Sequence, residues 1–389
     1  MQGHILELDG LRGIAILLVV ITHAFEFSIV QQDGWIAKLA SWGFSGVDLF
    51  FVLSGFLITG ILLDAKGLPA YFRNFYLKRA LRIWPLYYLL LFVAFGVFPF
   101  LSLHVHLTLG EMPLLESRSR LVYVLLLQNL RYPDTAAPSI LAMTWSLAIE
   151  EQFYIVWPWL VLLSTRKKLT YILTSVLVLS PVLRLLALLH GIDGDTIYYL
   201  TPFRLDDLSL GALIAIWYKS HVFSLCRTKW AAIVALAVGC PGSLWLLAGH
   251  VTHFKSLLAL RYSAIALASA GTVMIAIWSR QTDSILGRSL RARWLRYLGK
   301  ISYCLYLVHV PVYYALGGRA VKNHLGSNQE VAIFVMIFGF VVSASVSSLS
   351  WYMFESKILK LKGRLEYSHR MNEFLNGIDD PGRIVVKMG

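Results

Sequence analysis

An arginine and a histidine share one apolar segment near the start of the chain. The segment reads "LDGLRGIAILLVVITHAFEF" (residues 8–27), with Arg12 near its beginning and His23 toward its end. In a helix, eleven residues correspond to about 16 Å and return to nearly the same face. That face would carry a fixed cation at one end and at the other an imidazole, which exchanges protons near neutral pH. A ligand with a phosphorylated head and a long thin arm, such as acyl-coenzyme A, could touch both.

Each of these groups also has a purely structural explanation. A single histidine in a membrane helix often hydrogen-bonds a neighbouring helix. Arg12 could extend its charge to the inner membrane surface as an anchor. The basic segment "RARWLR" (residues 291–296) could be a loop that meets lipid headgroups. The positions of the remaining ionisable residues decide between these explanations.

The composition predicts an all-α, polytopic membrane protein. Of the 389 residues, 57% are hydrophobic and only 15% are charged, too few to cover a soluble protein of this length. Apolar runs of about twenty residues, long enough to cross a bilayer as helices, recur along the chain. We expect about ten spans, near residues 11–30, 42–63, 84–103, 145–164, 169–189, 198–218, 230–248, 256–278, 297–316 and 330–352. The three cysteines are too far apart and too few to indicate a disulfide framework or a metal site.

The distribution of lysine and arginine predicts the orientation. The loops on the N-terminal side of the expected bundle hold most of these residues, which places both termini in the cytoplasm. The net charge of +13 reflects this bias and does not indicate nucleic-acid binding. Residues 1–355 are expected to form the membrane domain and residues 356–389 a polar cytoplasmic tail. We further expect an interfacial amphipathic helix at 67–85 and a piece too short to span at 121–130.

With this topology, nearly all ionisable residues inside the expected spans fall in the outer half of the membrane. Such residues are costly to bury and therefore indicate function. They predict a polar cavity open to the outside, in which substrate would be bound by Glu151, Arg204, Asp206 and His309. Alternatively, Glu150, Arg204 and Asp206 could form a structural ion-pair network. The inner side carries basic residues suited to a multiply phosphorylated cytoplasmic ligand, namely Arg12, Arg79, Arg82, Arg291 and Arg293.

Seven segments, in order, resemble the membrane-bound acyltransferase family 3, the bacterial integral-membrane O-acyltransferases. They are "LDGLRGIAILLVVITH", "GVDLFFVLSGFLIT", "KRALRIWPLYY", "TWSLAIEEQFYIVWP", "FRLDDLSLGALIA", "LGKISYCLYLVHVP" and "WYMFESK". The resemblance runs from about residue 5 to residue 360. It implies ten core helices in the bacterial inner membrane, a cytoplasmic acyl-coenzyme A donor, commonly acetyl-coenzyme A, and an acceptor at or beyond the membrane. Some members carry an additional extracytoplasmic hydrolase-like domain, for which these 389 residues leave no room.

The resemblance also implies roles for individual residues. His23 matches the catalytic histidine and Arg12 its partner, Arg79 and Arg82 match a second basic motif, and Glu355 matches an acidic residue near the end of the last core helix. We expect His23 to act as the general base that deprotonates an attacking hydroxyl, with Asp48 or Glu150 orienting its ring. Direct transfer is preferred to an acyl-histidine intermediate, and no metal is required.

The expected enzyme is therefore an O-acyltransferase, of the class that transfers groups other than aminoacyl groups, acting on a carbohydrate hydroxyl. The carbohydrate could be an exopolysaccharide, a lipid-linked sugar or a surface glycan, and a small molecule such as a macrolide is an alternative acceptor. A proton-coupled transporter would also fit the composition, but the two halves of the chain show no repeat. A scaffold without chemistry would leave the shared depth of the buried charges unexplained. The pattern carries no signal for an oligomeric state.

Overall fold

The computed structural model describes residues 4–27, 39–97, 99–100, 117–130, 139–247, 255–282, 284–317 and 329–361. The described residues form helices and the turns between them, which confirms the all-α class. The long helices are α1 (Leu6–Phe27), α3 (Ser45–Ala65), α4 (Tyr71–Phe92), α7 (Trp145–Leu163), α8 (Arg166–Leu189), α10 (Leu205–Tyr218), α11 (Leu225–Leu247), α12 (Lys255–Ser279), α14 (Arg293–Gly317) and α16 (Gln329–Ser350). Shorter pieces include η1 (Trp42–Phe44), α6 (Ser117–Val124), η3 (Gln128–Leu130), α9 (Gly194–Tyr199), α13 (Ile285–Leu290), η6 (Trp351–Glu355) and α17 (Ser356–Lys360).

Within the described residues, six helical stretches are long and apolar enough to cross a membrane. They are Leu6–Phe27, Leu39–Ala65, Tyr71–Val97, Arg166–Leu189, Leu257–Ser279 and Glu330–Lys360. The other expected spans correspond to α7, α10, α11 and α14, of which α10 has only 14 residues. The chain is therefore a membrane protein by its helices, while the count of ten and the cytoplasmic termini stay predictions.

Helix α4 differs from its sequence-based expectation. An interfacial helix over 67–85 and a separate span from 84 were expected, but one helix runs from Tyr71 to Phe92 and continues through a π-helical turn to Val97. Tyrosine hydroxyls fasten this helix to its neighbours: Tyr71 donates to Pro158 O at 3.0 Å, and Tyr303 of α14 donates to Ile83 O at 2.7 Å. The separation was wrong because basic and aromatic residues on α4 face the partner helices α7 and α14.

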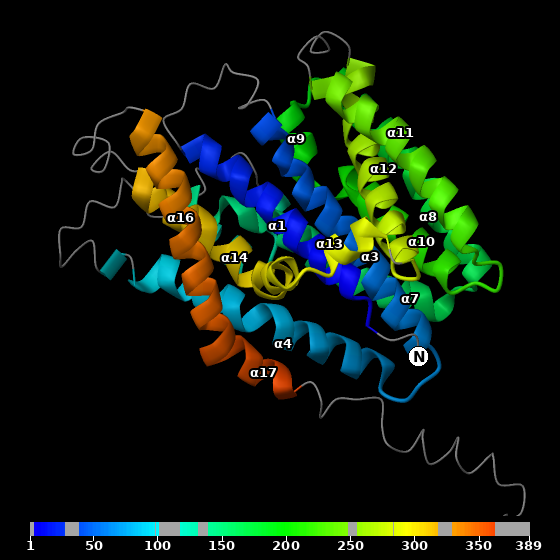
Figure 1. Cartoon of the computed structure of the whole chain (residues 1–389), viewed down its shortest axis with the longest axis horizontal. Helices are drawn as coiled ribbons and strands as arrows, with labels where there is room; N and C mark the ends of the chain where they lie inside the picture. Colours follow the sequence, from blue (N-terminus) through cyan, green and yellow to red (C-terminus); the bar gives the residue numbers. More distant parts are fainter. Residues whose placement is uncertain are drawn as a thin grey trace, which may run out of the picture.

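One end of the bundle collects the beginnings of α1, α4, α8 and α14 and the ends of α3, α7 and α10. At this end, Lys66 donates to Ser164 O at 2.6 Å, and Lys219 pairs with Asp64 at 2.6 Å. Arg166 donates to Lys219 O at 2.9 Å. This basic end, defined by Lys66, Arg166 and Lys219, is the one that the charge distribution predicts to face the cytoplasm. Figure 1 shows α1 at the centre, α11 and α12 paired at one side, and α16 beside α14 at the other.

Small residues bring α3 close to two neighbours. A Cβ atom on Gly46 would collide with Ala15 O of α1, and one on Gly55 would collide with Leu208 O of α10. The helices therefore pack backbone to backbone at these positions, as small residues permit in membrane proteins. Helix α3 is consequently held between α1 and α10.

Two other segments with expectations from the sequence are residues 121–130 and residues 356–389. Residues 121–130 form the end of α6 and the short η3 helix, with Gln128 and Asn129 buried. Of the expected tail 356–389, the structure describes only α17 and Leu361, and residues 362–389 lie outside the described residues. The division into a membrane domain and a tail stays a prediction.

Candidate active site

His23 of α1 and His309 of α14 form a direct pair. Their rings meet edge to face with centroids 4.9 Å apart, and His23 Nδ1 lies 3.2 Å from His309 Nε2. Each ring is also tied to its own helix, with His23 Nδ1 at 2.9 Å from Val19 O and His309 Nδ1 at 3.0 Å from Leu305 O. His309 is fully buried, whereas His23 is half-buried. Both histidines were predicted as site residues, and the fold brings them together.

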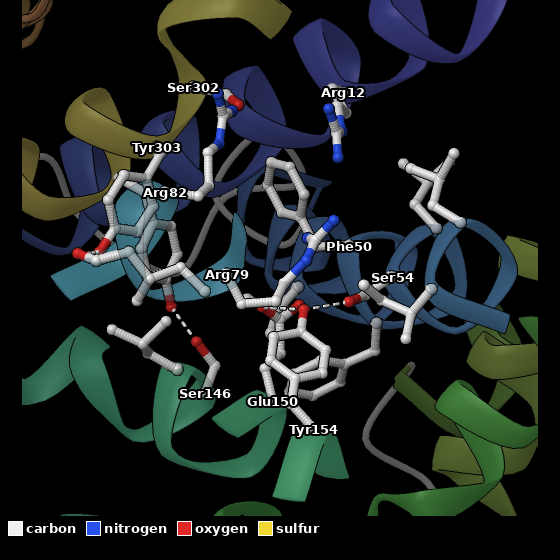
Figure 2. A pocket seen from close by; sticks show the side chains of 18 residues that line it. Arg12, Phe50, Ser54, Arg79, Arg82, Ser146, Glu150, Tyr154, Ser302 and Tyr303 are labelled. Atoms are coloured by element: carbon white, nitrogen blue, oxygen red, sulfur yellow. Dashed lines mark hydrogen bonds between the residues drawn. The ribbon is translucent and has the colours of Figure 1, made fainter. Parts of the chain in front are cut away.

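A pocket lies between α1, α3, α4, α7 and α14 and follows α3 from Val47 to Ile58, about 16 Å of helix. Figure 2 shows Arg12 from α1 and Arg79 and Arg82 from α4 reaching into it. Within the described residues, none of the three guanidinium groups has a carboxylate within 4.0 Å. The pocket thus combines a cluster of unpaired cations with apolar walls from α3. These three arginines were predicted to hold a phosphorylated ligand.

A polar chain crosses the same pocket. Tyr154 donates to Glu150 Oε2 at 3.2 Å, and Ser54 Oγ lies 2.5 Å from the Tyr154 hydroxyl oxygen. The Arg79 guanidinium lies over the Tyr154 ring, 5.8 Å from its centroid. Glu150 was expected beside His23 in an outer cavity, but its contacts place it among the arginines. Its carboxylate partly offsets their positive charge.

Tyr306 connects the pocket to the histidine pair. It lines the pocket, and its ring centroid lies 5.8 Å from that of His309. Its hydroxyl donates to Met143 O at 2.7 Å and lies 2.6 Å from Ser146 Oγ. The arginines, Tyr306 and the two histidines therefore follow one another through the bundle, with Tyr306 in between.

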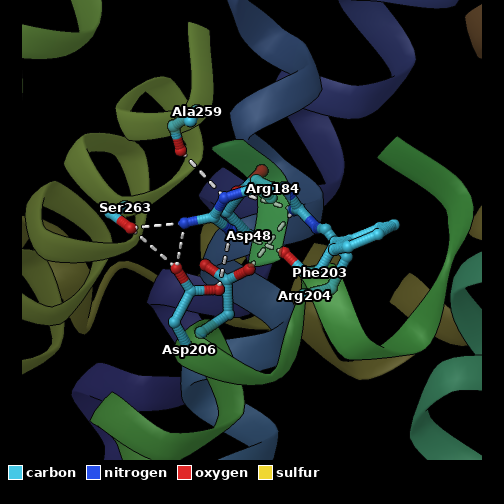
Figure 3. A network of polar contacts seen from close by, with 8 residues as sticks. Asp48, Arg184, Phe203, Arg204, Asp206, Ala259 and Ser263 are labelled. Carbon is cyan, nitrogen blue, oxygen red and sulfur yellow. Dashed lines mark hydrogen bonds and ion pairs between the residues drawn. The ribbon is translucent and has the colours of Figure 1, made fainter. Parts of the chain in front are cut away.

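Asp48, Arg204 and Asp206 belong to a different cluster, drawn in Figure 3. Arg204 donates to Asp48 Oδ1 at 2.7 Å, and Arg184 donates to Asp206 Oδ2 at 2.7 Å. Asp207 lies 3.3 Å from the Arg204 guanidinium, and every member is at most 1% exposed. The expected outer cavity lined by these charges is wrong, because they are sealed in the core, where each carboxylate lies beside a guanidinium group. Their contacts support the structural-network alternative for Arg204 and Asp206 but not for Glu150, and Asp48 bonds to Arg204 rather than to His23.

Four other predicted residues lie outside the pocket. Glu151 accepts from Trp84 Nε1 at 3.2 Å, and Arg291 pairs with Glu7 at 2.8 Å. Arg293 is exposed at the first residue of α14. Glu355 is buried in the π-helical turn η6, where it accepts from Ser350 Oγ at 3.3 Å. None of the four contributes to the pocket wall, so their binding roles stay predictions.

The pocket also contains residues that were not singled out. Tyr154 and Ser54 complete the chain to Glu150, and Tyr303 and Tyr306 form the wall on α14. Tyr303, Tyr306 and His309 occur at intervals of three residues and so fall on one side of a helix. This spacing in the sequence could have predicted that α14 forms one wall of the pocket.

Comparison with known proteins identifies the family. A family model described as "Acyltransferase domain" matches residues 5–351, which is nearly all of the chain. The chain belongs to this acyltransferase family. The resemblance inferred from the seven segments is thereby confirmed, as is the expectation of an enzyme class that transfers non-aminoacyl groups. The match also separates the chain from the transporter and scaffold alternatives.

Several curated proteins are similar over most of the chain. YrhL of Bacillus subtilis (strain 168) is 30% identical over 94% of this chain and 56% of its own length. The peptidoglycan O-acetyltransferase OatA of Listeria monocytogenes is 31% identical over 80% of this chain and 50% of its own length. The O-acetyltransferase OatA of Staphylococcus aureus is 26% identical over 91% of this chain and 57% of its own length. The chain thus spans about half the length of these relatives. No solved structure matches it.

Proposed function

We propose that the chain transfers an acyl group, specifically acetyl, from cytoplasmic acyl-coenzyme A to a hydroxyl group of a cell-envelope carbohydrate. The observation that carries this proposal is the pocket that holds Arg12, Arg79 and Arg82 and is lined by Tyr306, whose ring contacts His309 of the His23–His309 pair. Guanidinium groups without carboxylate partners are strong ligands for phosphate. The apolar stretch along α3 suits a pantetheine arm, and the arm would carry the thioester toward the histidines.

The proposed reaction uses His23 as the general base. His23 takes the proton of the acceptor hydroxyl while the hydroxyl oxygen attacks the thioester carbonyl carbon. The new C–O ester bond forms, the C–S bond breaks, and coenzyme A leaves as the thiolate that recovers the proton from His23. A positioned base of this kind contributes about 10²–10⁴-fold to the rate. The half-buried ring, held by Val19 O and His309, presents its other nitrogen for this step.

Peptidoglycan is the first acceptor to test, because two matched relatives are named for its O-acetylation. The acceptor would approach from the membrane face opposite the basic end, where α1 ends a turn beyond His23. A polysaccharide repeat unit, a lipid-linked sugar and a macrolide all present hydroxyl groups of similar chemistry. A survey of acylated products therefore precedes any assay with one chosen acceptor.

The first experiment compares three strains of the source bacterium: intact, deleted for this chain, and complemented with His23→Ala. Ester-linked acetate is measured by mass spectrometry on peptidoglycan, surface glycans and secreted glycans. We expect an acetyl ester that is present only in the intact strain, because alanine offers no base. Complementation with the wild-type chain and immunodetection of the variant in the membrane serve as controls.

Two results contradict the proposal. A His23→Ala strain that acetylates as well as the intact strain would remove His23 as the base. Identical acyl profiles in the intact and deleted strains would remove the glycan acceptor. A burst of free coenzyme A from purified protein without acceptor would replace direct transfer by an acyl-histidine intermediate.

A further inference from the structure

The hydrogen-bond partners of His309 determine where its proton lies. Its Nδ1 atom lies 3.0 Å from Leu305 O, and a carbonyl oxygen only accepts, so Nδ1 carries the hydrogen. A neutral imidazole has one hydrogen on nitrogen, which leaves Nε2 of His309 with a free lone pair. The complete burial of His309 favours this neutral form, because burial disfavours a charged ring.

The same reasoning applies to His23. Its Nδ1 atom lies 2.9 Å from Val19 O and 3.2 Å from His309 Nε2, and both of these partners are acceptors. His23 Nδ1 therefore carries the hydrogen and shares it between the two. The remaining nitrogen, Nε2, keeps its lone pair and has no hydrogen-bond partner among the described residues. The two helices together leave one basic nitrogen available on His23.

We propose that His309 is a positioning residue that holds His23 with its proton on Nδ1, so that Nε2 is the base in acyl transfer. This inference rests on the proposed function and assigns the orienting role to a neutral imidazole rather than to Asp48 or Glu150. When Nε2 of His23 takes the acceptor proton, the ring becomes a cation. The lone pair of His309 Nε2 then stabilises the N–H at Nδ1, the part that a carboxylate plays in other nucleophile–base arrangements.

The alternatives for His309 are less well supported by its contacts. Substrate binding requires access, but His309 is 0% exposed and lies behind His23 and Tyr306. A purely structural role would explain the hydrogen bond to Leu305 O, which lies on the same helix. A purely structural role would not explain why Nε2 of His309 faces Nδ1 of His23, which is the ring nitrogen of His23 that carries a hydrogen. The pair therefore has the geometry of a base and its orienting partner.

The first test is spectroscopic and does not require activity. The full chain, with ¹⁵N-labelled histidine, is placed in lipid nanodiscs, and the ring nitrogens are observed by solid-state NMR. The signals of His23 are identified by their loss in His23→Gln. We expect both His23 and His309 to carry hydrogen on Nδ1 and a bare Nε2. A wild-type His23 with its hydrogen on Nε2 would overturn the proposal whatever the enzyme does.

The second test separates positioning from binding. His309→Leu keeps bulk but removes the acceptor, whereas His309→Gln places a carbonyl oxygen near the former Nε2. With acetyl-coenzyme A and purified muropeptides as probes, we expect His309→Leu to lower kcat by about 10²-fold with KM for acetyl-coenzyme A unchanged. His309→Gln should restore a large part of that loss. Tyr313→Phe is the matched control. Tyr313 lies on α14 one turn from His309, and the substitution removes its hydrogen bond to Met336 O of α16.

Each outcome has a distinct meaning. A kcat for His309→Leu within twofold of wild type, or His309→Gln as inactive as His309→Leu, would overturn the positioning role. A change in KM for acetyl-coenzyme A alone would make His309 part of donor binding. If His23→Ala is as active as wild type, the proposed function fails instead, and the NMR result still reports the hydrogen positions. If His309→Leu does not fold, His309→Gln and the wild-type spectrum decide the matter.

Discussion

Arg12, Arg79 and Arg82 show how single side chains define the chemistry of the pocket. Their guanidinium groups meet there from two helices, and among the described residues of the pocket wall only Glu150, held by Tyr154, offers negative charge. An excess of cations facing an apolar channel is unfavourable without an anion, so the residues are arranged for a ligand rather than for stability. The same reasoning distinguishes them from Arg204, whose charge is fully paired.

Arg79→Ala is expected to weaken binding of the donor, because it removes one of these guanidinium groups. A hydrogen bond to a charged group contributes about 1.5–3 kcal/mol, which corresponds to a rise of about 10- to 100-fold in KM for acetyl-coenzyme A. The measurement is the initial rate of transfer to purified muropeptides as acetyl-coenzyme A is varied. Arg227→Ala, an exposed arginine on α11, is the matched control. Equal KM values for Arg79→Ala and wild type would place the donor elsewhere.

Helices α3, α8, α10 and α12 are joined by the buried network of Asp48, Arg184, Arg204, Asp206 and Asp207. Arg184 alone contacts Asp206 of α10 and Ala259 O of α12 from its position on α8. Buried charges of this kind are tolerated only while each has its partner. The network thus aligns the helices behind the pocket, including α3, which forms a long part of the pocket wall.

The network makes Arg204 a stability residue. Arg204→Met leaves Asp48 and Asp207 buried without their cation, which should cost about 3–5 kcal/mol of unfolding free energy. The readout is the apparent unfolding temperature of the purified chain in detergent, with Arg227→Met as the control. The double variant Asp48→Asn/Arg204→Met should recover part of the loss, because it removes one of the stranded charges. An Arg204→Met protein as stable as wild type but inactive would indicate a catalytic role instead.

Sequence patterns predicted the helices of the bundle but not all the partners of the buried charges, and the shared Arg12–His23 face stays a prediction. Hydropathy placed Asp48, Glu150 and His23 at similar expected depths in the membrane, and therefore in one cavity. Depth does not determine which way a side chain points around its helix, and that rotation sends Asp48 to Arg204 and Glu150 to Tyr154. The pairing of His23 with His309 depends on the contact between α1 and α14, which are distant in sequence.

The whole molecule has two different ends. The basic end gathers Lys66, Arg166 and Lys219, and the arginine side of the pocket lies toward it, while His23 lies toward the other end of α1. If the basic end faces the cytoplasm, a donor enters from inside and an acceptor is modified outside. The orientation of the bundle therefore determines the direction of transfer across the membrane.

Native cysteines offer a test of that orientation. Cys226, at the beginning of α11, is exposed, and Cys304 is buried. A membrane-impermeant maleimide should label Cys226 in inside-out vesicles and not in intact cells, because α11 begins on the predicted cytoplasmic side. Cys226→Ser identifies the labelled residue. Labelling of Cys226 in intact cells would reverse the orientation and, with it, the side from which the donor enters.

The most direct test of the central claim is transfer by the purified full chain in liposomes. Radiolabelled acetyl-coenzyme A is the donor and purified muropeptides are the acceptor, and both labelled product and released coenzyme A are measured for wild type and His23→Ala. We expect wild type to release coenzyme A only when acceptor is present. In His23→Ala the rate of release should fall by about 10²-fold or more. Equal rates for the two proteins, with both correctly inserted, would contradict the proposal that His23, paired with His309 beside this pocket, is the base in acyl transfer.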